Sequence, residues 1–167
     1  MPDLKRLTKD GIPAALAKAE RYRLLAQPWE AESIYLDVLA VEPHDEAALT
    51  GLVLALTDQF AHGGPGLVRR ARELLPRLAD EYDRAYYAGI ICERWAKALL
   101  DQHNPGTGST VYELLLEAKD WYEKAEALRP PGNDDALLRW NACVRLAARH
   151  PEVAAAPAER TQPYVDH

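Results

Sequence analysis

The chain has 167 residues, of which 48% are hydrophobic and 28% are charged, and its formal net charge is −6 at pH 7. This size predicts one domain with a sizeable core. The acidic balance and the lack of any run of five basic residues argue against binding of nucleic acid through a broad basic face. No stretch approaches 18 consecutive apolar residues, and the first ten residues do not resemble a secretory signal. We therefore expect no membrane span and a cytoplasmic protein.

Hydrophobic periodicity near 3.6 residues predicts helices throughout the chain. The first spans residues 12–26, and Pro28 then opens a second helix that ends near residue 41. Asp45 is a suitable N-cap for a third helix at 46–60. This third helix is apolar on most faces, so we expect it at the centre of the core.

The second half of the chain continues the helical pattern, with two loops. A loop rich in glycine and proline at 61–66 leads to a helix at 67–82, which Pro76 should kink or break, and the next helix spans 84–102. After a loop at 103–108, Thr110 and Glu113 match a capping box for a sixth helix, which ends near residue 128. A seventh helix is predicted at 134–148. Residues 150–167 have three prolines and no periodicity, which predicts a tail that is disordered or draped on the surface.

One spacing of residue types occurs twice. It places a small residue, an aromatic residue, a small or β-branched residue and a proline at offsets 0, 4, 7 and 12. The two copies are Ala31, Tyr35, Val38 and Pro43, and then Ala118, Tyr122, Ala125 and Pro130; a weaker copy is Ala71, Leu75 and Leu78. In each full copy the first three residues share one helical face, and the proline follows the helix end. Such repetition of helical hairpins indicates a solenoid.

The two full copies resemble the second-helix signature of tetratricopeptide repeats. In the preceding helix, Ala19 and Tyr22 stand where that family places a small residue and an aromatic residue. The family repeat is about 34 residues long, whereas the three copies here are spaced by 40 and then 47 residues. The extra residues coincide with the two loops and with a longer helix around them. The resemblance covers residues 12–148.

The resemblance implies an all-α fold, namely a right-handed α-solenoid of about three antiparallel helical hairpins at residues 1–149 with its last helix as a C-terminal cap. It also implies a noncatalytic scaffold or adaptor, whose partner is a protein or peptide. In such arrays the first helices of successive hairpins line a concave groove, where an extended peptide or a partner's helix binds. The residues expected to face this groove are Glu20, Arg23, Thr50, Leu54, Thr57, Asp58, Ile90, Glu93, Arg94, Leu138 and Arg145. The family's carboxylate clamp is not visible on the first and third helices, so an acidic C-terminal peptide is not expected.

Other interpretations stay open. The same charges could form a solvated face with intramolecular pairs. The chain could instead be a self-assembling structural protein that forms homo-oligomers, because its first helix lacks an obvious polar cap. A third possibility is a helical enzyme or ligand carrier that uses a pocket beneath the two long loops. No catalytic, cofactor-binding or metal-ligating set is predicted, since Cys92 and Cys143 are expected to be buried thiols and no histidine has a partner at helical spacing.

Overall fold

The computed structural model describes residues 1–157, and all regular structure in that range is helical. The helices are α1 (Ile12–Leu24), α2 (Pro28–Val41), α3 (Glu46–Thr57), α4 (Phe60–Leu74), α5 (Glu81–Asp101), α6 (Gly108–Leu128) and α7 (Asp135–Arg149). Short 3-10 helices precede α1 at Lys9–Gly11 and follow α4 at Leu75–Arg77. The prediction of an all-α fold with seven helices is confirmed for the described residues.

Several helix ends follow directly from local chemistry. Pro28 occupies the first turn of α2, where its missing N–H does no harm. The Asp45 side chain accepts a hydrogen bond from the backbone N–H of Ala48 at 2.8 Å, so the predicted N-cap of α3 is confirmed. Asp80 caps α5 in the same way, because its carboxylate accepts from the backbone N–H of Tyr82 at 3.0 Å.

The predicted bounds of α4 are wrong at both ends. The helix includes the expected loop at 61–66 and is broken only at Gly64, whose φ of +66° lies in the left-handed region that glycine tolerates. It ends at Leu74, and Pro76 confines the following turn to a 3-10 helix, so the predicted break at this proline is confirmed. Leu78 is extended, and α5 begins three residues later.

The capping box expected at Thr110 and Glu113 does not form. The helix begins two residues earlier, at Gly108, so Thr110 lies inside its first turn and no side chain caps it. Gly108 is in close contact with the chain after α7, since a side chain at position 108 would collide with the carbonyl of Glu152. Val153 packs onto the core nearby. The described part of the predicted tail is therefore draped on the surface, and residues 158–167 lie outside the described residues.

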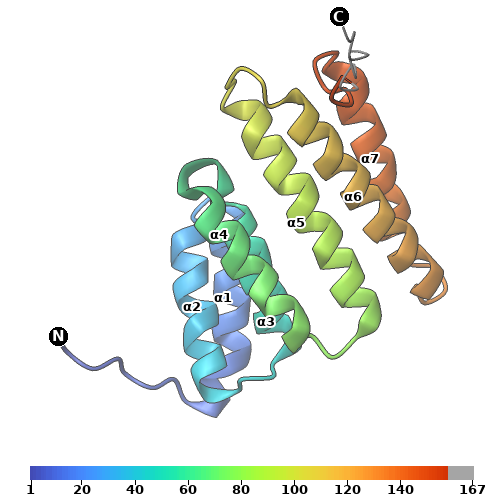
Figure 1. Cartoon of the computed structure of the whole chain (residues 1–167). Coiled ribbons are helices and arrows are strands. Elements are labelled where there is room, and N and C mark those ends of the chain that lie inside the picture. Colours follow the sequence, from blue (N-terminus) through green and yellow to red (C-terminus); the bar gives the residue numbers. More distant parts are fainter. Residues whose placement is uncertain (158–167) are drawn as a thin grey trace, which may run out of the picture.

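The helices pack mainly in chain order. Each α-helix contacts the next one, and α3 also contacts both α1 and α5. Figure 1 shows α1–α4 grouped at one side of the molecule and α5–α7 side by side at the other, with α5 and α6 antiparallel. Because of the contacts of α3, the helices α1, α3 and α5 form one row. This row brings together side chains from distant parts of the sequence.

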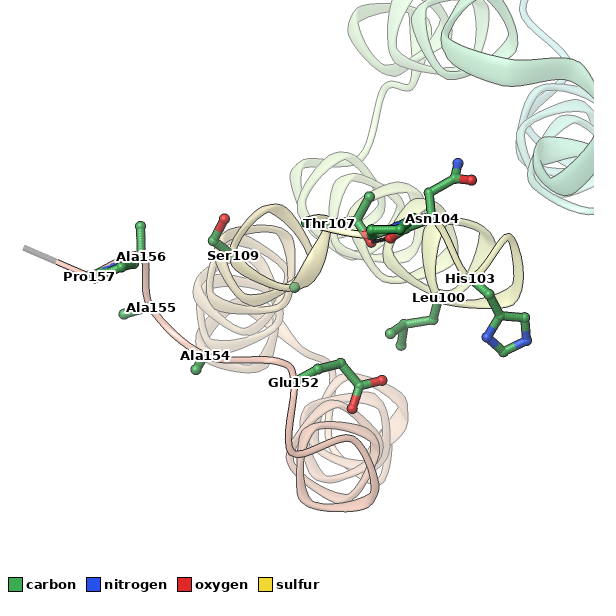
Figure 2. A pocket seen from close by; sticks show the side chains of 13 residues that line it. Leu100, His103, Asn104, Thr107, Ser109, Glu152, Ala154, Ala155, Ala156 and Pro157 are labelled. Atoms are coloured by element: carbon green, nitrogen blue, oxygen red, sulfur yellow. Dashed lines mark hydrogen bonds between the residues drawn. The ribbon is translucent and has the colours of Figure 1, made fainter.

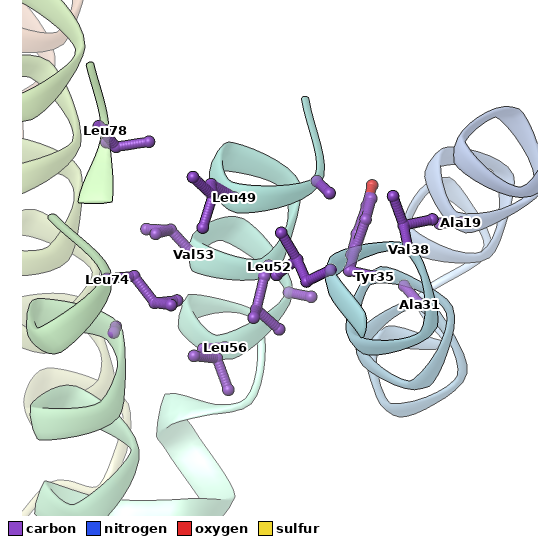
Figure 3. Close-up of a cluster of buried hydrophobic side chains, with 14 of the residues drawn as sticks. Ala19, Ala31, Tyr35, Val38, Leu49, Leu52, Val53, Leu56, Leu74 and Leu78 are labelled. Atoms are coloured by element: carbon purple, nitrogen blue, oxygen red, sulfur yellow. The ribbon is translucent and has the colours of Figure 1, made fainter. Parts of the chain in front are cut away.

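The buried hydrophobic residues form two clusters. The first is built mainly from α1–α4 and is largely aliphatic, with Leu49, Leu52, Val53 and Leu56 of α3 at its centre (Figure 3). The expectation that this helix lies at the centre of a core is thus confirmed. The second cluster is built from α5, α6 and α7, and it is rich in aromatic residues.

The repeated spacing marks buried positions in both halves. Ala31, Tyr35 and Val38 are buried in the first cluster, and Ala118, Tyr122 and Ala125 are buried in the second. Each tyrosine lies against a glycine, because a methyl group on Gly51 would collide with the Tyr35 ring and one on Gly89 would collide with the Tyr122 ring. Tyr35 thus packs on the helix that follows its own, whereas Tyr122 packs on the helix that precedes it.

Candidate functional site

The row of α1, α3 and α5 carries most of the residues that the sequence predicted for the groove. We call this region the α1–α3–α5 surface. It is made by Glu20 and Arg23 on α1, Thr50 and Leu54 on α3, Asp58 directly after α3, and Arg94 on α5. Glu20 is exposed, and the other five are half-buried. The surface is therefore partly accessible, and it combines four charged side chains with one threonine and one leucine.

Three of these residues form an ionic triad that links the three helices. Arg23 Nε donates to Asp58 Oδ2 at 2.8 Å, and Arg94 Nη1 donates to Asp58 Oδ1 at 3.2 Å. The Asp58 side chain is only 20% exposed, so solvent screens this triad less than it screens a fully exposed pair. These three charges therefore pair within the molecule, as one of the alternative interpretations expects. Each of them is still partly exposed to solvent.

A first hollow lies on one side of Arg23, between α1, α2 and α3. Its volume is about 390 Å³, and Leu16, Tyr35, Gly51 and Leu54 give it an apolar lining. Glu20, Arg23 and Thr50 also line it. We call it the apolar hollow. Its depth depends on Gly51, because any side chain at that position would have to displace the Tyr35 ring.

A second hollow lies on the other side of Arg23, between α1, the start of α4, and α5. Its volume is about 550 Å³, and it is lined by Arg23, Asp58, Arg94, Lys97 and Asp101 together with apolar atoms of Phe60 and its neighbours. We call it the basic hollow, because three cationic side chains reach it and only two carboxylates do. Arg23 borders both hollows.

Lys97 and Asp101 are residues of this surface that the sequence reasoning missed. They stand three and seven positions after Arg94, so all three share one face of α5. Charged residues at these offsets are the signal that could have identified the pair.

Two predicted groove residues are buried in the second core instead, and these expectations are corrected: Glu93 is 0% exposed and Ile90 is buried. Thr57 is also buried, but it lines the basic hollow. Neighbouring positions on an α-helix point about 100° apart, so Arg94 reaches the surface while Glu93 turns toward α6 and α7. Two further predicted residues, Leu138 and Arg145, are exposed on α7 but line neither hollow.

Glu93 is the centre of a buried polar cluster in the second core. Its Oε1 atom lies 3.4 Å from the Tyr122 hydroxyl, 3.5 Å from Cys143 Sγ and 3.4 Å from Arg139 Nε, and its Oε2 atom lies 3.5 Å from Lys97 Nζ. The two cations compensate the charge of the carboxylate. The cluster thus holds α5, α6 and α7 together.

Burial in the second core raises the pKa of both thiols. Burial, followed by the nearby charge of Glu93, raises the pKa of Cys143 to about 12, and burial raises the pKa of Cys92 to about 12. A thiol with such a pKa is protonated at neutral pH and is a poor nucleophile or metal ligand. The two cysteines are free and buried, as the sequence predicted.

A third hollow lies at the start of α6, beside one of the two long loops that the ligand-carrier interpretation names. It has a volume of about 480 Å³ and lies between the α5–α6 loop and the segment after α7 (Figure 2). Its polar side chains are those of His103, Asn104, Thr107, Ser109 and Glu152. Among residues 1–157 no group of three or more metal-ligating side chains comes together.

Comparisons with known proteins found no match for this chain, whether with protein families, with curated proteins or with solved structures. None of the helices in residues 1–157 is long and apolar enough to cross a membrane.

Proposed function

We propose that this chain is a noncatalytic protein-interaction module that binds a peptide or a partner's helix on the α1–α3–α5 surface. In this proposal the helices form a tetratricopeptide-like right-handed solenoid. The hairpins are α1–α2, α3–α4 and α5–α6, and α7 is the C-terminal cap. The observation that carries the proposal is the convergence of Arg23, Asp58 and Arg94, 35 and 36 residues apart, between two hollows on one face.

The chemistry of this face supports binding rather than catalysis. It offers an apolar hollow beside charged groups that are partly desolvated, a combination that is typical of recognition surfaces. The two thiols, which are the strongest nucleophile candidates, lie in the core with raised pKa values.

The proposal is tested by capture of partners from an extract of the native host with two matched double variants. Arg23→Gln with Arg94→Gln removes two cations from the α1–α3–α5 surface. Arg69→Gln with Lys124→Gln removes two exposed cations from α4 and α6 and is the control. We expect the first variant to lose captured partners several-fold, most strongly at low salt, while the control binds as the wild type does. Equal losses in both variants, with circular dichroism unchanged, would contradict the proposal.

Self-assembly is the second candidate, and one observation favours it. Leu24, Leu25 and Trp29 are 81%, 61% and 67% exposed at the turn between α1 and α2. Large apolar side chains that gather on a surface often mark contacts between chains. Light scattering separates the two functions, because self-assembly predicts a particle larger than one chain that dissociates in the Trp29→Glu variant.

A further inference from the structure

We infer that the α1–α3–α5 surface recognises an extended peptide that places an apolar side chain in the apolar hollow and an acidic side chain in the basic hollow, about three residues apart. This inference rests on the proposed function and gives its partner a chemical class. It follows from three features of the surface, namely the lining of each hollow, the hydrogen-bonding capacity of the triad and the positions of the two hollows along α3.

The apolar hollow selects an uncharged side chain. Leu16, Tyr35 and Leu54 supply its walls, and the absence of a side chain at Gly51 leaves room beside the tyrosine ring. Glu20 stands at its exposed edge and repels an acidic residue. A buried apolar group gains about 25 cal/mol for each Å² removed from water, so this hollow is the natural anchor of the complex.

The basic hollow has three cationic donors, and its carboxylate acceptors are Asp58 and the exposed Asp101. Both oxygens of Asp58 already accept hydrogen bonds from the two arginines. Arg94 reaches Asp58 only through Nη1, and Lys97 has one carboxylate neighbour for its three donor hydrogens. A ligand that enters this hollow must therefore supply acceptors, and a carboxylate supplies them with the complementary charge.

The positions of the two hollows along α3 set the spacing and favour an extended chain. Residues 47–54 line the apolar hollow, and Thr57 and Asp58 line the basic hollow, so the two are centred about seven residues apart, or about 10 Å along a helix. An extended peptide covers this distance in about three residues, at about 3.3 Å each. The ion pair between Arg23 and Asp58 separates the two hollows, so the ligand has to cross this pair to occupy both of them.

The test is selection of random peptides displayed on phage with the full chain as bait. We expect enriched peptides to carry a Leu, Ile, Phe or Trp residue two to four positions from an Asp or Glu residue. Enrichment of Lys and Arg, or of apolar residues alone, would overturn the inference while leaving the proposed function intact. If no enriched peptide loses binding to the Arg23→Gln and Arg94→Gln double variant, both the inference and the proposed function fail.

Two surface variants then test each hollow with the enriched peptides as probes. Asp101→Lys removes an exposed carboxylate from the basic hollow, and we expect about two- to fivefold tighter binding that weakens with salt. Ala47→Phe fills the apolar hollow and should weaken binding at least tenfold. The controls are Asp120→Lys and Ala127→Phe, which make the same changes at exposed sites on α6. Tighter binding by both lysine variants, or equal losses from both phenylalanine variants, would contradict the assignment of the hollows.

Discussion

The two hydrophobic clusters are built on different principles, although both contain a copy of the same sequence spacing. The first, in α1–α4, is mostly aliphatic, and its buried Glu32 lies at the edge, where it bonds to the half-exposed Arg70 at 2.7 Å. The second, in α5–α7, surrounds the fully buried Glu93 with a tyrosine hydroxyl, a thiol and two cations. The repeat thus fixes which helical faces are buried, but not what those faces contact.

We propose that the difference has a functional consequence. Arg23 and Asp58, beside the first cluster, lie on the α1–α3–α5 surface, where the proposed partner binds. The second encloses Glu93, and its tyrosines pack on one another, as in the stacked pair Tyr82–Tyr86 with ring centroids 5.7 Å apart. We therefore expect perturbations of the second cluster to affect mainly stability, and perturbations of the α1–α3–α5 surface to affect mainly binding.

The largest expected effect comes from removing the tyrosine of each copy. Tyr122→Ala should destabilise the fold by about 3–5 kcal/mol, because it leaves a closed cavity and removes a polar neighbour of Glu93. Tyr35→Ala should cost less, because Tyr35 borders the apolar hollow and water can enter the space it leaves. Denaturant unfolding measures both values. Equal costs would show that the two copies have equivalent environments.

A smaller effect is expected from enlarging the alanine that begins each copy. Ala31 and Ala118 are both 0% exposed, so a leucine at either site overpacks its cluster and should cost about 1–3 kcal/mol. Ala127→Leu on the exposed face of α6 is the control and should be close to neutral. If Ala118→Leu leaves the midpoint of thermal unfolding unchanged, the helical register derived from the spacing is incorrect.

Alkaline pH should weaken the second cluster more than the first. The pKa values of Cys92 and Cys143 rise from 9.0 to about 12 on folding, so the folded state holds these protons more tightly. The resulting stability is present below pH 9 and is lost as the pH rises toward 12, by up to about 1 kcal/mol per thiol at pH 10. Denaturant unfolding at pH 8 and pH 10 measures this loss. The Cys92→Ala and Cys143→Ala double variant should lose less stability than the wild type over that interval. If both proteins lose the same amount, the two thiols do not cause the loss.

The sequence predicts those features of this fold that depend on local chemistry. Asp45 as a cap, the break at Pro76 and the buried faces of the repeated spacing all follow from backbone geometry and helical periodicity. Glycines at 61–66 suggested a loop, but the structure needs only one left-handed residue there, so the helix continues on either side of Gly64.

The candidate site was predictable only in part, because burial depends on neighbours that are distant in sequence. The resemblance to tetratricopeptide repeats predicts Arg23, Asp58 and Arg94, because the first helices of such hairpins line a groove, and Lys97 could have been found from its spacing. Glu93 looks from the sequence like another surface charge. It is buried because Tyr122 and Cys143, 29 and 50 residues further along the chain, close over it.

The central claim is that the α1–α3–α5 surface binds an extended peptide, and hydrogen–deuterium exchange of the full chain tests it most directly. Exchange is measured with and without a peptide obtained by the phage selection. A bound peptide slows local opening, so amides beneath it exchange more slowly. The account predicts slower exchange in α1, α3 and α5 and unchanged exchange in α6 and α7. Slower exchange confined to α2, α4 or α6, or to the segment beside the start of α6, would contradict it.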